Sequence, residues 1–129
     1  MTHSSEFLRN CADFYSLSGI SINKVEEAEK RLGLQFAEDY KDYLLRFGLA
    51  SANGHEFTGL CYSPRLNVVN VTEKERERNK NISSDMYVLE DLNIDHAIVW
   101  QSSSGAIYQT IEDSYPVEIY SSFEDYCNS

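Results

Sequence analysis

Histidine and cysteine are the residue types in this sequence that could bind zinc or act as a base and a nucleophile. They show neither an H-E-x-x-H pair nor two cysteines at metal-ligand spacing, so we expect no metal and no cofactor. His55 and Cys61 could be imagined as base and nucleophile, but beside a strand they are expected to point where packing directs them. The scattered residues are His3, His55, His96, Cys11, Cys61 and Cys127.

Carboxylates offer a second kind of chemistry. The adjacent acids Glu90 and Asp91, and likewise Glu112 and Asp113, could serve acid–base or metal chemistry. The sequence contains no phosphate-binding loop, dinucleotide fingerprint or nucleophile elbow beside them. Acids at strand ends and turns are mostly solvated. We therefore expect no catalytic residues, and an enzyme is the least favoured class of function.

Glu29 is an unusual carboxylate because it lies on the apolar face of an expected helix. Val25, Ala28 and Leu32 share this face. A buried carboxylate must find hydrogen-bond donors or change its protonation. We expect Glu29 to accept hydrogen bonds from backbone N–H groups of a neighbouring loop or helix start. The alternative is a buried general base, which no accompanying nucleophile supports.

The acidic residues are segregated along the chain. All 11 basic residues precede position 85, whereas residues 85–129 carry nine carboxylates and no Lys or Arg. The first 84 residues carry 12 acids and 11 bases, so nearly all of the net charge of −10 belongs to the last third. Such a surface attracts a cationic partner and argues against nucleic acid, which Lys and Arg bind. The alternative explanation is an acidic surface that serves solubility alone.

Composition sets the class of protein. A chain of 129 residues with 42% apolar residues is expected to fold as one domain around its own core. It contains no apolar run long enough for a membrane helix and no basic region followed by an apolar run. Three distant cysteines fit reduced thiols better than a disulfide framework. We expect a cytoplasmic protein without membrane contact.

Apolar periodicity predicts helices first and strands afterwards. Three amphipathic helices are expected at 5–16, 23–32 and 37–47, with Asn23 or Ser21 capping the second. This order predicts an α+β domain in which amino-terminal helices pack on a mostly antiparallel sheet and a short carboxy-terminal helix follows. The later elements are expected as strands at 57–62, 66–71, 86–89, 97–101, 106–110 and 117–120, a helix from the capping box at Thr72 to about 80, and a last helix after Ser122.

Several motifs, in order, resemble the SUKH superfamily. Ala37 stands where that family usually has proline. The resemblance spans about residues 20–127 and includes the helical acid Glu29. The matching residues are Val25, Ala28-Glu29 and Leu32-Gly33 for the helix expected at 23–32, Tyr40, Tyr43-Leu44 and Gly48 for the helix expected at 37–47, then Gly59-Leu60, Val71-Thr72 with Arg76, Gly105-Ala106-Ile107-Tyr108 and Ser122-Phe123-Glu124-Asp125-Tyr126.

The resemblance implies a function in protein binding. Many bacterial members of the superfamily are immunity proteins that neutralise a cognate toxin, often a nuclease, whereas fungal relatives act in cell-wall regulation. We therefore expect a non-catalytic immunity protein that occludes a basic toxin domain, with a regulatory adaptor for an endogenous protein as the alternative. The sequence leaves the oligomeric state open. The expected partner-binding residues are Glu90, Asp91, Asp95, Glu112 and Asp113, with Tyr115 as an aromatic anchor.

Overall fold

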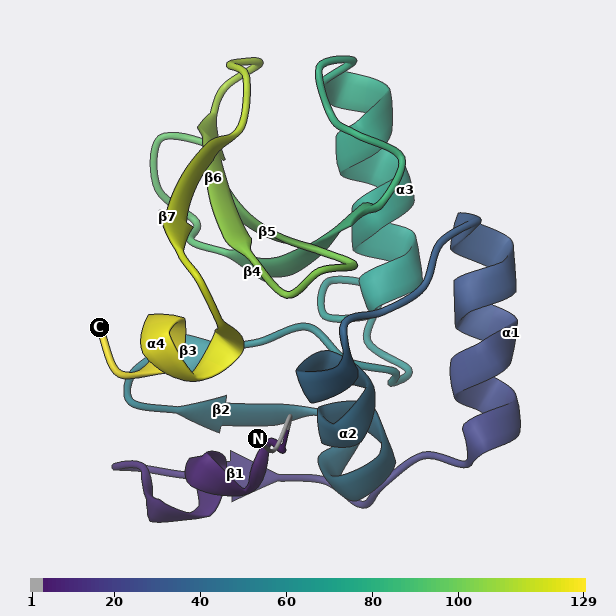
Figure 1. The fold of residues 1–129 in the computed structure, drawn as a ribbon, viewed down its shortest axis with the longest axis vertical. Coiled ribbons are helices and arrows are strands. Elements are labelled where there is room, and N and C mark those ends of the chain that lie inside the picture. The colour runs from purple at the N-terminus through teal and green to yellow at the C-terminus, as the bar shows by residue number, and fades with distance from the viewer. Residues whose placement is uncertain (1–3) are drawn as a thin grey trace.

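Two antiparallel sheets with packed helices form the structure, a computed structural model that describes residues 4–129 (Figure 1). The smaller sheet has the strand order β1-β2-β3 and the larger one the order β4-β5-β6-β7. The α+β class and the short carboxy-terminal helix are confirmed. The elements are the 3-10 helix η1 (Glu6–Asn10), β1 (Tyr15–Ser16), α1 (Ile22–Leu32), α2 (Glu38–Phe47), β2 (Ala50–Ala52), β3 (His55–Glu56), α3 (Val68–Arg78), β4 (Met86–Asp91), β5 (Ala97–Ser102), β6 (Ile107–Ile111), β7 (Val117–Tyr120) and α4 (Phe123–Cys127).

The helices α1 and α2 lie where the apolar periodicity predicts them. Ser21, rather than Asn23, caps α1: its hydroxyl oxygen accepts a hydrogen bond from the Lys24 N–H at 3.4 Å. Gly33 ends α1 in the left-handed conformation, with φ of 70°. The N–H of Ala37, which a proline would lack, donates to the Tyr87 hydroxyl at 3.0 Å.

The predicted amino-terminal helix at 5–16 is wrong beyond its first turns. Residues 6–10 form η1, and the chain then extends into β1, which pairs with β2. Tertiary contacts hold this segment in place. The Ser5 N–H and hydroxyl both donate to Asp42 Oδ2, at 2.8 and 2.7 Å, and the ring of Phe7 packs edge-on against Phe123 at 5.5 Å. Leu8 is thus buried and Phe7 partly buried without a long helix, whereas Tyr15 remains 66% exposed.

The predicted strands at 57–62 and 66–71 are also wrong. The second of them contains the beginning of α3, because the side-chain oxygen Oδ1 of Asn67 accepts hydrogen bonds from the N–H groups of Val69 and Asn70 at 3.0 and 3.3 Å. This cap precedes the predicted start at Thr72 by more than a turn. The strands of this region, β2 and β3, instead form a short hairpin at 50–56.

The larger sheet separates two apolar clusters. Tyr87 and Leu89 of β4 belong to the main core with residues of α2 and α4, whereas Val88 and Trp100 pack with Val71 of α3 in the smaller cluster. Trp100 is 1% exposed, as predicted for a core residue, and its Nε1–H donates to Thr110 Oγ1 at 3.0 Å. Within residues 4–129, no helix has the length and apolar character that crossing a membrane requires.

Candidate protein-binding surface

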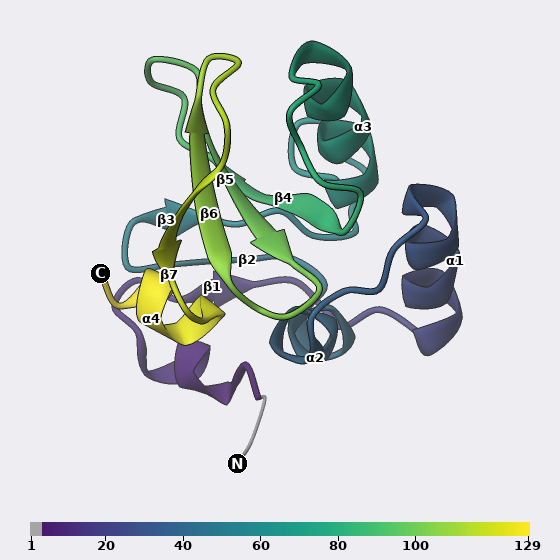
Figure 2. The ribbon, with the colours of Figure 1, turned by 45° about the horizontal axis from the view of Figure 1, so that its top comes forward.

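Two loops meet at one end of the larger sheet. They join β4 to β5 (residues 92–96) and β6 to β7 (residues 112–116), and both lie at the same end of the sheet in Figure 2. Strand pairing sets Ala97 beside Ile111, and the Glu112 N–H donates to the His96 carbonyl at 3.3 Å. We call residues 91–96 and 111–117 the hairpin end.

The hairpin end exposes apolar side chains among carboxylates. Tyr115 is 74% exposed, and three aliphatic side chains not foreseen as partner-binding are 48–64% exposed. A protein interface typically has such an apolar centre within a polar rim. Four of the predicted acids therefore lie in the same two loops as these apolar residues, at one end of the fold. The aliphatic residues are Ile94, Ile111 and Val117, and the acids are Asp91, Asp95, Glu112 and Asp113.

Backbone contacts fix the shape of the hairpin end. The Asn93 N–H donates to Asp91 Oδ1 at 2.9 Å, which makes a local turn. The end of α3 holds the other loop, because the Asn79 and Asn81 side-chain amides donate to the carbonyls of Ser114 and Asp113 at 2.9 and 2.8 Å. Specific hydrogen bonds thus hold both loops of the hairpin end in place.

Glu90 lies inside the protein, so its expected place on the acidic surface is corrected. It is 5% exposed. One carboxylate oxygen contacts His55 Nδ1 at 2.9 Å and accepts a hydrogen bond from the Tyr126 hydroxyl, and the other accepts the Glu56 N–H at 2.8 Å. Glu90 therefore joins β3 and α4 to the larger sheet and is not accessible to a partner.

A β-bulge explains why Glu90 points inward. Val88 pairs with Trp100, but Glu90 pairs with Val99, so Leu89 is an extra residue in β4. Paired residues of antiparallel strands point to the same face, and Val99 belongs to the main core. Strict alternation would have placed Glu90 on the same face as Val88.

A second buried carboxylate, Glu75, supports the hairpin end from α3. It is 2% exposed, and one of its oxygens lies 2.9 Å from His96 Nε2. The predicted T-x-x-E capping box is therefore wrong: Glu75 binds the 92–96 loop, and the Thr72 hydroxyl accepts the Val88 N–H at 3.0 Å. Sequence reasoning missed Glu75 because its contact with His96 joins residues 21 positions apart.

The remaining candidates for chemistry have structural contacts. His55 contacts Glu90, whereas the Cys61 thiol donates to the Ser63 carbonyl at 3.6 Å. His3 lies outside the described residues. Among residues 4–129, no group of three or more His, Cys, Asp or Glu side chains is placed to hold a metal ion. Glu29 fulfils the structural prediction: it is 5% exposed and accepts the Phe36 N–H at 2.9 Å.

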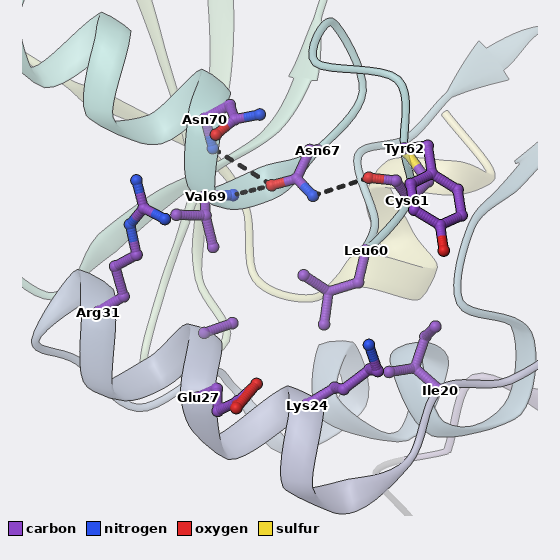
Figure 3. Close-up of a pocket in the computed structure, with 11 residues that line it drawn as sticks. Ile20, Lys24, Glu27, Arg31, Leu60, Cys61, Tyr62, Asn67, Val69 and Asn70 are labelled. Carbon is purple, nitrogen blue, oxygen red and sulfur yellow. Dashed lines mark hydrogen bonds between the residues drawn. The ribbon is translucent and has the colours of Figure 1, made fainter.

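A separate groove of about 640 Å³ lies between α1, the 60–62 loop and the start of α3 (Figure 3). Asn67 shapes its upper wall in Figure 3: the side-chain amide donates to the Cys61 carbonyl at 2.9 Å while the side-chain oxygen caps α3. Tyr62 is fully exposed at the rim. The apolar side chains that line it are Ile20, Ala28, Leu60 and Val69.

Opposite charges alternate along the α1 wall of the groove. Lys24, Glu27 and Arg31 follow one another at spacings of three and four residues. Arg31 is already engaged, because its guanidinium makes two hydrogen bonds to Glu73 at 3.1 and 3.2 Å. The groove thus lacks the single sign of charge found at the hairpin end.

Comparison with known protein families gives a match that covers most of the chain. Residues 22–127 match the family SUKH_6, described as SMI1-KNR4 cell-wall. No curated protein matches the chain. The matched range contains both sheets except β1, and it contains the whole hairpin end and the groove except Ile20.

Proposed function

The chain belongs to the SUKH (SMI1-KNR4) family, and from this membership we propose that it is an immunity protein. It binds a cognate toxin domain, a basic nuclease, and neutralises that domain by non-covalent occlusion. It acts by binding and not by turnover, in the cytoplasm where the toxin would do its damage.

The observation that carries the proposal is the composition of the hairpin end. Tyr115 and three aliphatic residues are exposed there beside four carboxylates. Binding energy in protein interfaces concentrates in a few well-packed side chains, and aromatic residues are enriched among them. The exposed ring of Tyr115 is the proposed anchor, and the neighbouring acids form the rim.

Charge gives the second argument. A nuclease presents Lys and Arg to the phosphates of its substrate. An acidic inhibitor complements the same basic surface, and electrostatic attraction can raise association rates to about 10⁸–10⁹ M⁻¹s⁻¹. Fast capture favours an inhibitor whose target is harmful while free. Slow dissociation would then come from the apolar contacts.

An affinity pull-down of the tagged protein from its own host, at low and moderate salt, tests the proposal. We expect one stoichiometric basic partner that wild type retains at moderate salt. The variant Glu112→Gln/Asp113→Asn should lose it at a lower salt concentration, and Tyr115→Ala should release it faster. The matched control Glu26→Gln/Glu124→Gln removes the same charge from exposed sites outside the hairpin end. Equal retention by all variants would contradict the proposed surface.

The groove favours a second candidate, a regulatory adaptor that binds an endogenous protein. A fully exposed tyrosine beside an apolar groove with balanced charge fits an uncharged peptide segment. For an adaptor, Tyr62→Ala should abolish capture while the hairpin-end variant keeps it. The pull-down would then recover several partners, whose retention depends little on salt, instead of the single basic partner.

A further inference from the structure

Two of the three cysteines meet although 116 positions separate them in the sequence. The Sγ atoms of Cys11 and Cys127 are 3.8 Å apart. Cys11 follows η1 and is half-buried, whereas Cys127 is the last residue of α4 and is fully buried. A disulfide has an S–S length of about 2.05 Å, so the sulfur atoms must approach by roughly 1.8 Å.

Asn53 holds the two cysteine-bearing segments together. Its side-chain amide donates to the Cys127 carbonyl at 3.0 Å. Its side-chain oxygen accepts the N–H of Ala12, the residue after Cys11, at 2.9 Å, and its own N–H donates to the Ala12 carbonyl at 2.8 Å. The edge-on contact between Phe7 and Phe123 adds a second link between η1 and α4. The thiols are therefore kept close by contacts on both sides.

We propose that Cys11 and Cys127 form a reversible disulfide by exchange with a small-molecule disulfide of the glutathione type. This bond locks the amino-terminal segment, residues 5–16, to α4. The proposal does not depend on the proposed function. The proposal is compatible with the expectation of reduced thiols, because both cysteines stay reduced until a small-molecule disulfide is present.

The order of the two steps follows from accessibility. The Cys11 thiolate attacks one sulfur of the small disulfide, forms a mixed disulfide and releases one thiolate. Cys127 then loses its proton and attacks Cys11 Sγ, which releases the second thiolate. Two protein thiols thus become one disulfide, and the small disulfide takes up two electrons and two protons to leave as two thiols.

Cys127 is poorly suited to the first attack. Burial, followed by the neighbouring Cys11 sulfur, raises the pKa of Cys127 to about 12, so little thiolate is present at neutral pH. The half-buried Cys11 is therefore the thiol that reacts first.

The bond would connect a segment outside the family match to the matched domain. Cys11 precedes the matched range 22–127, and Cys127 is its last residue. The bond closes nearly the whole chain into a loop, and long loops restrict the unfolded state most. We expect a melting temperature higher by about 5 °C or more in the oxidised protein. Dithiothreitol should reverse this increase.

Incubation of the full chain with oxidised glutathione, followed by thiol counting and peptide mass spectrometry, tests the inference. The three free thiols of wild type should fall to one, with a peptide that joins Cys11 to Cys127. The matched control Cys61→Ala should form the same linked peptide. Cys11→Ser, at the half-buried position, should prevent it and abolish the gain in melting temperature.

Two kinds of result would overturn the inference. One is a stable mixed disulfide on Cys11 that leaves Cys127 free, or no loss of thiols at all. The other is a linkage that runs through Cys61. Cys11→Ser retains the buried Cys127 thiol, so this test holds even if substitution of Cys127 unfolds the protein.

Discussion

The carboxylate of Glu29 has a structural role. It accepts the Phe36 N–H at 2.9 Å and lies 3.5 Å from the ammonium group of Lys41. Glu29→Leu leaves the buried N–H without an acceptor, which costs about 2 kcal/mol of unfolding free energy. Glu29→Gln keeps an acceptor oxygen and should lose about 1 kcal/mol or less. Urea denaturation measures both.

The control for this series is Glu26→Leu, an exposed position on the same helix. Its unfolding free energy should stay within about 0.5 kcal/mol of wild type. Loss of partner binding in a fully stable Glu29→Gln variant would show that the carboxylate has a role in recognition instead.

Tyr126 and Glu90 form the central polar contact of the main core. Burial, together with the Glu90 carboxylate, raises the pKa of Tyr126 above its usual range, so the hydroxyl stays protonated and donates. Tyr126→Phe should lower the unfolding free energy by about 1.5–3 kcal/mol, the usual range for a hydrogen bond to a charged group. Thermal or urea denaturation measures the difference.

Tyr120→Phe is the matched control, since the structure gives the Tyr120 hydroxyl no hydrogen bond within residues 4–129. It should change stability by less than about 0.5 kcal/mol. Equal losses for the two tyrosines would mean that removal of a hydroxyl group in general, and not loss of the contact with Glu90, accounts for the effect.

At the scale of elements, periodicity was informative wherever an element packs by one regular face. It gave α1, α2 and the four strands of the larger sheet to within a few residues. It failed at residues 66–71, where β-branched residues suggest a strand but the Asn67 side chain caps a helix. The cap was in the sequence, but Thr72 offered a stronger capping pattern nearby.

The candidate site was predictable in part for the same reason. Exposed acids in turns were foreseen, because polar residues between strands belong to loops. The inward position of Glu90 was not, because a single extra residue at Leu89 exchanges the two faces of β4. Composition and spacing carry no clear signal for such a bulge.

Attachment of η1 to α2 should depend on pH. Burial raises the pKa of Asp42, but hydrogen bonds from Ser5 and Arg46 outweigh this effect and lower the pKa below its ordinary value. Because the pKa of Asp42 is lower in the folded than in the unfolded protein, the ionised carboxylate stabilises the fold. The stabilisation is complete above about pH 4, the pKa of Asp in the unfolded chain, and it is lost as the pH falls through the lower pKa of the folded protein. Asp42→Asn should therefore lower the melting temperature at neutral pH, and its difference from wild type should shrink as the solution becomes acidic.

Melting temperatures between neutral pH and about pH 3 check this prediction, with hydrogen exchange of residues 5–12 as a local readout. Asp113→Asn serves as the control, because this exposed side chain has no hydrogen bond within the described part of the chain. A constant difference between wild type and Asp42→Asn across the pH range would contradict the assignment.

At the scale of the whole molecule, the net charge of −10 predicts self-repulsion in the folded state. Added salt should therefore raise the melting temperature, because it screens the exposed carboxylates. Glu112→Gln/Asp113→Asn should show a smaller increase than wild type. Ion pairs such as Arg65 with Glu56, at 2.8 Å, lie outside the hairpin end and oppose this trend.

Calorimetric melting of both proteins over a salt series measures the two slopes. Glu26→Gln/Glu124→Gln, with the same change in charge, should keep a slope closer to that of wild type. Identical slopes for the two double variants would mean that the repulsion is spread over the surface and not concentrated at the hairpin end.

The contact between η1 and α4 has a consequence for synthesis. The ribosome makes Cys11 116 residues before Cys127, which corresponds to roughly 6–23 s at about 5–20 residues per second. During this interval residues 5–16 have no α4 to pack against. Residues 5–16 are thus made long before they can dock on α4, and a nascent chain stalled before residue 123 should expose Phe7 and Cys11 to proteases and thiol reagents.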